Sequence, residues 1–161
     1  MSILNIITAP HTTLRTRAVE IPVEEIPKLQ GFIKDMKETM LKKDGIGLAG
    51  NQIDVLKRLI VVNTKDGPLA LINPKISGKS FKKEEGEEGC LSLPNIYGIV
   101  RRHRKITVSA YTQDGTRVKL KTTGLFARVI QHEVDHLNGV LFTDRAKKMT
   151  KGNKPDEPTN L

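Results

Sequence analysis

The segment TGLFARVIQHEVDHLNG, residues 123–139, predicts the central helix of the fold. His132 and His136 are four residues apart, so on a helix they lie one turn apart on the same face. Both imidazoles can therefore reach one metal ion, with Glu133 beside them. A carboxylate in that position can take a proton from a metal-bound water. The alternative interpretation is a helix with two partly exposed histidines and a solvated glutamate.

The apolar residues of this segment favour the metal site. Leu125, Val129, His132 and His136 follow a 4-3-4 spacing, so the histidines continue an apolar stripe that should face the core. Histidines that point inward beside a carboxylate need polar partners, and a metal supplies them. Gly139 marks the expected end of a helix that begins near residue 123.

The 161-residue chain is predicted to form one domain, because a chain of this length can bury a hydrophobic core without disulfides or structural metals. No apolar run is long enough to cross a membrane, so we expect no membrane association. The single cysteine excludes an internal disulfide and suits a reducing compartment. The N-terminus lacks a secretory or transit pattern, so we predict a cytoplasmic protein. A chain imported into an organelle and processed there would look the same.

The net charge of +9 fits either a polyanionic partner or ordinary solvated surface charge. The lysines and arginines are scattered along the chain, aromatic residues make up only 4%, and no RNA-binding signature is present. We therefore interpret the charge as solvated surface and expect no specific nucleic-acid binding. A weak association with the ribosome fits the charge, although no motif indicates it.

Further elements are predicted from periodicity and turn residues. A 3-4-3-4 spacing of apolar residues predicts an amphipathic helix over about 26–43, with Pro27 in its first turn. Short apolar or alternating runs predict strands over 59–62, 69–72, 106–110 and 118–120. The charged segment 82–88 is predicted to be a loop, and the polar tail 147–161 to be disordered.

This order of elements predicts the α+β class. We expect antiparallel β-sheets packed around a central metal-binding helix, with an N-terminal helix. The expected single domain covers residues 1–146.

Two further segments offer groups for the site. Cys90, flanked by glycine and charge, would complete a borderline-soft metal site with the two histidines. Its alternative role is that of a small buried hydrophobe. Residues 45–52, GIGLAGNQ, fit either a helix C-cap with a small-residue loop or backbone that approaches a ligand. In the second case the Gln52 amide could donate to a developing oxyanion.

Three separated segments, GIGLAGNQ (45–52), EGCLS (88–92) and QHEVDH (131–136), resemble the three signature motifs of the peptide deformylases. They occur in that family's order and at similar separations, and the similarity runs over about residues 6–142. The resemblance implies an enzyme that hydrolyses the N-formyl group from N-formylmethionine on nascent polypeptides and releases formate.

The resemblance also implies a role for individual residues. Cys90, His132 and His136 would bind one divalent transition metal, with water in the fourth position. The family's metal in cells is usually Fe²⁺, and Zn²⁺, Ni²⁺ or Co²⁺ also support activity. Glu133 would be the general base and acid for the water that attacks the formyl carbon. The oxyanion would be held by the Gln52 amide, the Leu91 backbone N–H and the metal.

Substrate contacts are implied in the same way. Four residues match positions that line the methionine slot in the family, namely Ile46, Gly47, Leu125 and Val129. Ordinary core packing would explain these residues equally well. Gly89 would let substrate backbone run alongside the protein as an added strand. Tyr97 stands where many members carry an arginine toward the second substrate residue.

Two predictions concern charged neighbours of the motifs. Glu88 is expected to pair with Arg101 or Arg102 and so to brace the Cys90 segment, because bidentate carboxylate–guanidinium pairs position well. Asp135 is expected to face solvent or to bond locally, without a catalytic role.

Two other functions share parts of this pattern but fit the sequence less well than deformylation does. A zinc peptidase of the H-E-x-x-H type usually takes its third ligand downstream of the helix, where this chain offers only Glu157 in a polar tail. A basic RNA-associated module with a structural metal would need a fourth protein ligand.

Overall fold

The computed structural model describes residues 2–155 and confirms the α+β class. Its helices are the 3₁₀ helices η1 (Thr12–Arg15), η2 (Val23–Leu29) and η3 (Gly50–Ile53), and the α-helices α1 (Gln30–Lys42), α2 (Gly124–Leu137) and α3 (Phe142–Arg145). Its strands are β1 (Gly47–Ala49), β2 (Leu59–Thr64), β3 (Gly67–Lys79), β4 (Lys83–Cys90), β5 (Leu93–His103), β6 (Lys105–Tyr111), β7 (Arg117–Thr123) and β8 (Lys148–Lys151). Within the described residues, no helix has the length and apolar character needed to span a membrane.

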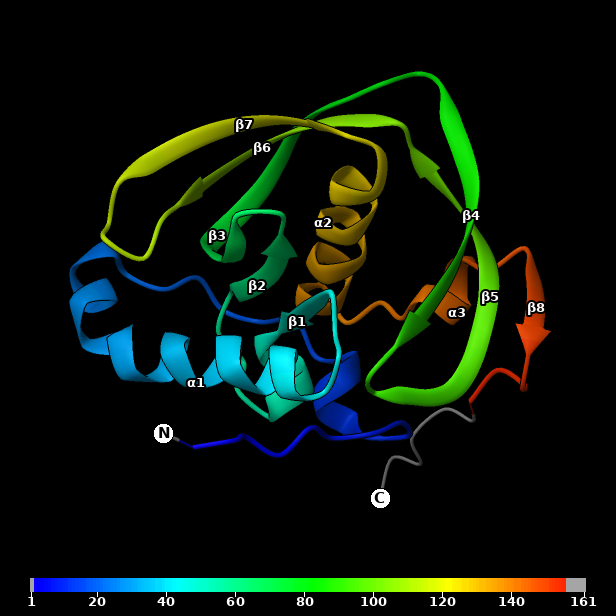
Figure 1. Cartoon of the computed structure of the whole chain (residues 1–161), viewed down its shortest axis with the longest axis horizontal. Helices are drawn as coiled ribbons and strands as arrows, with labels where there is room; N and C mark the ends of the chain where they lie inside the picture. The colour runs from blue at the N-terminus through cyan, green and yellow to red at the C-terminus, as the bar shows by residue number, and fades with distance from the viewer. Residues whose placement is uncertain (1, 156–161) are drawn as a thin grey trace.

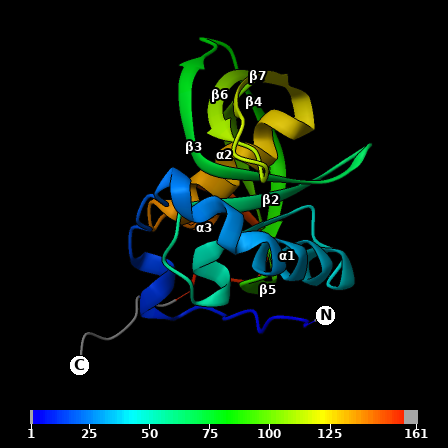
Figure 2. The ribbon, with the colours of Figure 1, turned by 90° about the vertical axis from the view of Figure 1, so that its left-hand side faces the viewer.

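The strands form two antiparallel sheets around α2 (Figure 1). The larger sheet has the order β1-β2-β3-β6-β7, and the smaller has the order β4-β5-β8. The helix α2 contacts strands of both sheets, while α1 lies on the outside of the larger sheet (Figure 2). The prediction of a central helix surrounded by antiparallel sheets, with a further helix near the N-terminus, is therefore confirmed.

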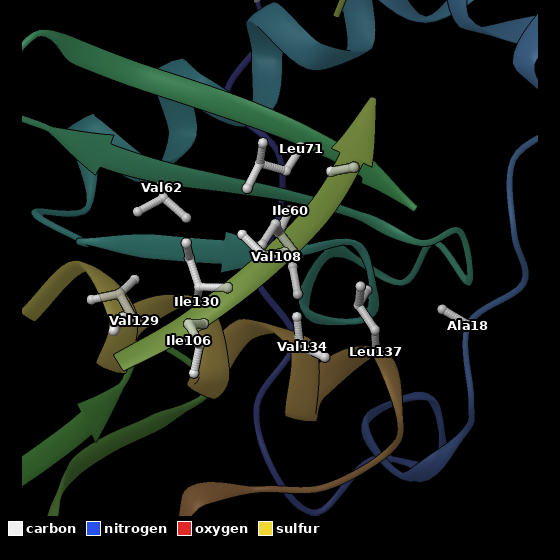
Figure 3. Packing of buried hydrophobic residues seen from close by; sticks show 13 residues of the cluster. Ala18, Ile60, Val62, Leu71, Ile106, Val108, Val129, Ile130, Val134 and Leu137 are labelled. Carbon is white, nitrogen blue, oxygen red and sulfur yellow. The ribbon is translucent and has the colours of Figure 1, made fainter. Parts of the chain in front are cut away.

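The core holds α2 against the larger sheet (Figure 3). The contacting side chains are Ile60 and Val62 of β2, Leu71 of β3, Val108 of β6, and Val129, Ile130, Val134 and Leu137 of α2. The intervening residues of β2, Leu59 and Val61, face the opposite way into a second cluster with α1. Both faces of β2 are thus buried, which explains its continuous apolar run. Each buried aliphatic side chain contributes about 1.5–3 kcal/mol, so this packing fixes the position of α2.

The N-terminal helix begins later than predicted. Residues Val23–Leu29 form the 3₁₀ helix η2, with Pro27 inside it, and the α-helix starts only at Gln30. Proline has no backbone N–H for the hydrogen bond of an α-helix interior, so the regular helix begins beyond it.

The prediction of a charged loop over 82–88 is wrong, because residues 83–88 lie in strand β4. The strand pairs with β5 along its length, and the register sets Glu84 opposite Arg102 and Glu85 opposite Arg101. Glutamates of this strand also form ion pairs, Glu84 with Arg104, Glu85 with Lys147 and Glu88 with Arg102. A segment that is too polar for a strand by itself thus becomes one beside its partners.

The prediction of a disordered tail is also wrong for part of 147–161. Strand β8, Lys148–Lys151, pairs with β5 at Tyr97, Gly98 and Ile99. The backbone N–H of Lys147 donates to the carbonyl of Ile99, so the segment covers an otherwise open sheet edge. The remaining predicted tail, 156–161, lies outside the described residues.

Candidate metal and peptide site

Three metal-ligand side chains converge from two elements. Cys90 ends β4, while His132 and His136 lie one turn apart on α2. One ligand atom from each residue lies within 4.8 Å of the other two, and Cys90 Sγ is 3.3 Å from His136 Nε2. The structure therefore brings together the three residues that the sequence proposes as ligands.

The surroundings of this group fit a cation. His132 Nδ1 is 2.8 Å from Glu88 Oε1, so its Nδ1–H can donate to the carboxylate and leave Nε2 for an ion. Burial alone would lower the pKa of His132, but the contacts with Cys90 and Glu88 raise it well above its ordinary value. Burial, together with the charge of His132, lowers the pKa of His136. A thiolate and imidazoles in anionic surroundings are a donor set for a divalent transition metal.

Glu88 is the centre of a buried ion network. Arg102 donates to it from Nε at 3.0 Å and from Nη2 at 2.9 Å, and Arg128 Nη1 donates at 2.7 Å. Burial alone would raise the pKa of Glu88, but the hydrogen bonds from His132 and Arg102 hold it well below its usual range. The predicted Glu88 pairing is confirmed, with Arg102 as the partner.

The prediction that Asp135 faces solvent or bonds only locally is wrong. Asp135 is buried and accepts hydrogen bonds from Arg102 Nη1 at 2.6 Å and from Arg145 Nε at 2.6 Å. Arg102 thereby joins two carboxylates that lie on different elements. A chain of ion pairs runs from Arg145 of α3, through Asp135 and Arg102, to Glu88 beside His132.

Glu133 is a buried carboxylate on the inner wall of the site. The residue is 4% exposed, and its Oε2 has no hydrogen-bond partner among the described residues. Burial raises the pKa of Glu133 to about 7. A Cβ at Gly47 would overlap Glu133 Oε1, so only glycine at this position of β1 leaves room for the carboxylate.

The two predicted oxyanion donors border the same space. Gln52 lies in η3, where its Oε1 accepts a hydrogen bond from the Ala49 backbone N–H at 2.9 Å. Its Nε2 then points toward Cys90 Sγ at 3.4 Å and Ser92 Oγ at 3.2 Å. The bond to Ala49 fixes which end of the amide is the donor. Leu91 follows Cys90 in the turn between β4 and β5 and also lines the cavity.

A cavity of about 400 Å³ opens beside these groups, a size that suits a small peptide end. Its lining includes all six residues proposed for substrate contact, namely Ile46, Gly47, Gly89, Tyr97, Leu125 and Val129. The prediction that Leu125 belongs to the apolar, core-facing side of the helix is wrong, since Leu125 is 66% exposed. It lies in the first turn of α2, at the cavity. The Tyr97 ring covers Gly89, where a Cβ would lie 2.5 Å from the ring.

Sequence reasoning missed two residues of the site. Arg128 lines the cavity and donates to Glu88, to the Val100 carbonyl at 2.9 Å and to the Glu84 carbonyl at 2.8 Å. Its position four residues before His132 places it one turn away on the same side of α2, a spacing that could have identified it. The fully buried Ser92, which accepts the Gln52 hydrogen bond, carried no comparable signal.

Known proteins match this chain along nearly its whole length. The polypeptide deformylase family model matches residues 3–152. Peptide deformylase 1 of Bacillus subtilis is 43% identical over 150 residues, which cover 92% of each chain. The crystal structure of peptide deformylase from Thermotoga maritima is 38% identical, with a TM-score of 0.87, and the match covers 91% of this chain and 99% of that one. The Met-Ala-Ser bound crystal structure of class I type b peptide deformylase from Acinetobacter baumannii is 33% identical, with a TM-score of 0.85, and the match covers 90% of this chain and 100% of that one.

Proposed function

The chain belongs to the polypeptide deformylase family, and from this membership we propose how its own residues remove the N-formyl group from nascent peptides. The observation that carries the proposal is the meeting of Cys90, His132 and His136 beside a peptide-sized cavity. Membership of this family also sets aside the zinc peptidase and the structural-metal module as functions of the chain.

Cys90, His132 and His136 would hold one divalent transition metal, which we propose to be Fe²⁺ in cells, with Zn²⁺, Ni²⁺ or Co²⁺ as substitutes. Such an ion supplies Lewis-acid chemistry, since it polarises a carbonyl and brings the pKa of a bound water to about 7. By accepting a hydrogen bond from His132 Nδ1, Glu88 would leave the Nε2 of this imidazole available as the ligand atom.

Glu133 is the proton carrier of the proposed reaction. Its carboxylate lines the cavity, and its Oε2 has no partner among the described residues, so it is free to accept a proton from the attacking water. The water oxygen bonds to the formyl carbon, and the bond from that carbon to nitrogen breaks. Glu133 then gives its proton to the leaving amine, and the products are formate and a peptide with a free N-terminus.

The developing oxyanion would be held by Gln52 Nε2 and the Leu91 backbone N–H. The hydrogen bond from Ala49 to Gln52 Oε1 holds the amide in the donating orientation before substrate arrives. A donor that is fixed in advance is typically worth about 3 kcal/mol at the transition state.

N-formylmethionyl peptides suit the lining of the cavity. Ile46, Leu125 and Val129 offer apolar surface for a methionine side chain. Gly47 and Gly89 both line the cavity, where substrate backbone would run alongside the protein as an added strand. The Acinetobacter baumannii relative has a crystal structure with Met-Ala-Ser bound, and this tripeptide is the product that formyl-Met-Ala-Ser would leave.

Formate release from formyl-Met-Ala-Ser tests this mechanism when wild-type protein is compared with Glu133→Ala. We expect the variant to keep its metal, because Glu133 is not a ligand, and to lose about 10²–10⁴-fold in turnover. Retained turnover would remove Glu133 from its role. Cleavage of casein without formate release would overturn the reaction itself.

A further inference from the structure

The outward side of β3, β6 and β7 gathers cations that are far apart in the sequence. Ile106, Val108 and Ala110 of β6 point inward to the core with α2, so the alternate residues of this part of the sheet point outward. The outward cations, all exposed, are Lys75 of β3, Lys105 of β6, and Arg117, Lys119 and Lys121 of β7. We call these five residues the basic face. Strand β7 is an edge strand of the larger sheet, and β6 lies between it and β3 (Figure 1).

The strand register separates these cations with hydroxyl groups. Each cation lies directly opposite a neutral residue: Lys105 opposite Thr123, Lys121 opposite Thr107, Lys119 and Lys75 opposite Ser109, and Arg117 opposite Tyr111. No two like charges are therefore directly opposed. Alternate residues of β7 are about 6.7 Å apart, and Lys75 and Lys119 are two strand spacings apart, about 10 Å. Positive charges and hydroxyls thus share one continuous surface.

The charge of the basic face is not balanced within the protein. Strands β3, β6 and β7 contain no aspartate or glutamate. Over residues 2–155, none of the five cations takes part in an ion pair. The acidic residue of the β6–β7 turn, Asp114, accepts hydrogen bonds from Thr112 and Thr116 instead.

The strands of the smaller sheet carry both signs of charge. There Glu84 pairs with Arg104 at 3.3 Å, and Glu85 pairs with Lys147. Acidic and basic side chains are therefore neighbours on the smaller sheet, whereas the strands of the basic face carry cations without any carboxylate. Five exposed cations on strands without a carboxylate form a positive surface, and the partner that matches such a surface is an external polyanion.

We propose that the basic face binds the phosphate backbone of double-stranded RNA without reading its sequence. Lysine and arginine neutralise phosphates, and hydroxyls such as those of Thr107, Ser109 and Thr123 bond both to phosphates and to the 2′-hydroxyls that RNA displays in its shallow groove. None of the exposed large apolar side chains lies on β3, β6 or β7, so the face lacks the groups that enter a membrane or form the centre of a protein interface.

Bound RNA would leave the peptide cavity open. None of the residues that line the cavity comes from β3, β6 or β7. The proposal therefore concerns a second surface and does not depend on the proposed reaction. It also differs from the sequence-based interpretation of solvated charge, because only the strand register brings these cations together.

Fluorescence anisotropy with a labelled RNA duplex of about 16 base pairs tests the proposal on the metal-loaded full chain. The test variant is Arg117→Gln/Lys119→Gln/Lys121→Gln. The control, Lys42→Gln/Lys43→Gln/Lys57→Gln, removes the same charge from exposed lysines elsewhere. For the wild type we expect a slope of log affinity against log salt of about −4 to −5. The test variant should lose about three units of that slope and bind at least tenfold more weakly at about 50 mM salt, while the control stays near wild type.

Several results would overturn the proposal. Equal losses in both variants would mean that only net charge matters. Equal binding of a DNA duplex of the same sequence, or stronger binding to phosphatidylserine vesicles, would remove the assignment to RNA. Formate release from formyl-Met-Ala-Ser is measured on the same samples without RNA and should be unchanged in the test variant. A failure of RNA binding is thereby separated from a failure of the proposed reaction.

Discussion

Replacing Arg102 by methionine should destabilise the fold by about 3–5 kcal/mol, the usual cost of removing one member of a buried ion pair. The Arg102 side chain is 4% exposed and donates to both Glu88 and Asp135. Glu88 would keep Arg128 and His132, while Asp135 would keep only Arg145, whose side chain is 50% exposed. Methionine fills similar space but carries no donor, so both carboxylates would remain buried with fewer partners.

Thermal unfolding of the metal-loaded protein measures this effect. For a chain of this length, each kcal/mol corresponds to about 2–4 °C, so we expect a fall of about 6–20 °C in Tm. The matched control is Arg101→Met, which removes the same charge from the neighbouring residue of β5. Arg101 is exposed, and an exposed cation contributes at most about 1 kcal/mol.

A second measurement separates positioning from plain stability. Glu88 orients His132, so a Glu88 that has lost Arg102 should hold the imidazole less firmly. We expect Ni²⁺ to bind Arg102→Met about 10–100-fold more weakly than Arg101→Met, under conditions where both proteins are folded. Equal Tm values for the two variants would refute the reasoning about the buried network. Equal Ni²⁺ affinities would refute the link to His132.

Three other changes test separate parts of the site and fold. Gly47→Ala should lower kcat/KM about 10²-fold, because the added Cβ would overlap Glu133 Oε1. The control is Gly31→Ala, whose Cβ would have no other atom within 4 Å and should leave activity unchanged. Equal activities of the two variants would contradict the close contact between Gly47 and Glu133. Cys90→Ser replaces a thiolate by a poor ligand, so metal content after dialysis should fall well below one per chain, and an unchanged content would point to a different third ligand. Truncation after Ala146 removes β8 and should lower the free energy of unfolding by about 1–3 kcal/mol, measured by thermal unfolding. An unchanged Tm would mean that the pairing of β8 with β5 adds no stability.

The sequence predicted those elements whose hydrophobic periodicity or alternation lies within a single segment. The helix α2 followed from its 3.6-residue periodicity, and the β6–β7 hairpin followed from alternation around Asp114-Gly115. The spacing of His132 and His136 likewise needs nothing beyond one helix. Cys90 was inferred from its chemistry, and the structure places it beside both histidines.

Features that depend on distant partners were missed or misread. Strand β4 is too charged to suggest a strand until it lies beside β5 and its glutamates meet Arg102, Arg104 and Lys147. Asp135 was interpreted as a surface residue because neither of its partners is on its own helix. Arg102 is distant along the chain, and Arg145 lies beyond the end of α2. The same reason explains why the basic face could not be seen in the sequence, since register alone assembles it.

Stepwise addition of Fe²⁺ to metal-free protein, under anaerobic conditions, tests most directly whether Cys90, His132 and His136 form the reaction centre. The measured quantity is formate release from formyl-Met-Ala-Ser at each ratio of metal to protein. We predict no release at the start, a linear rise, and saturation at one ion per chain. Full release from the metal-free protein, or saturation at a different ratio, would contradict the assignment.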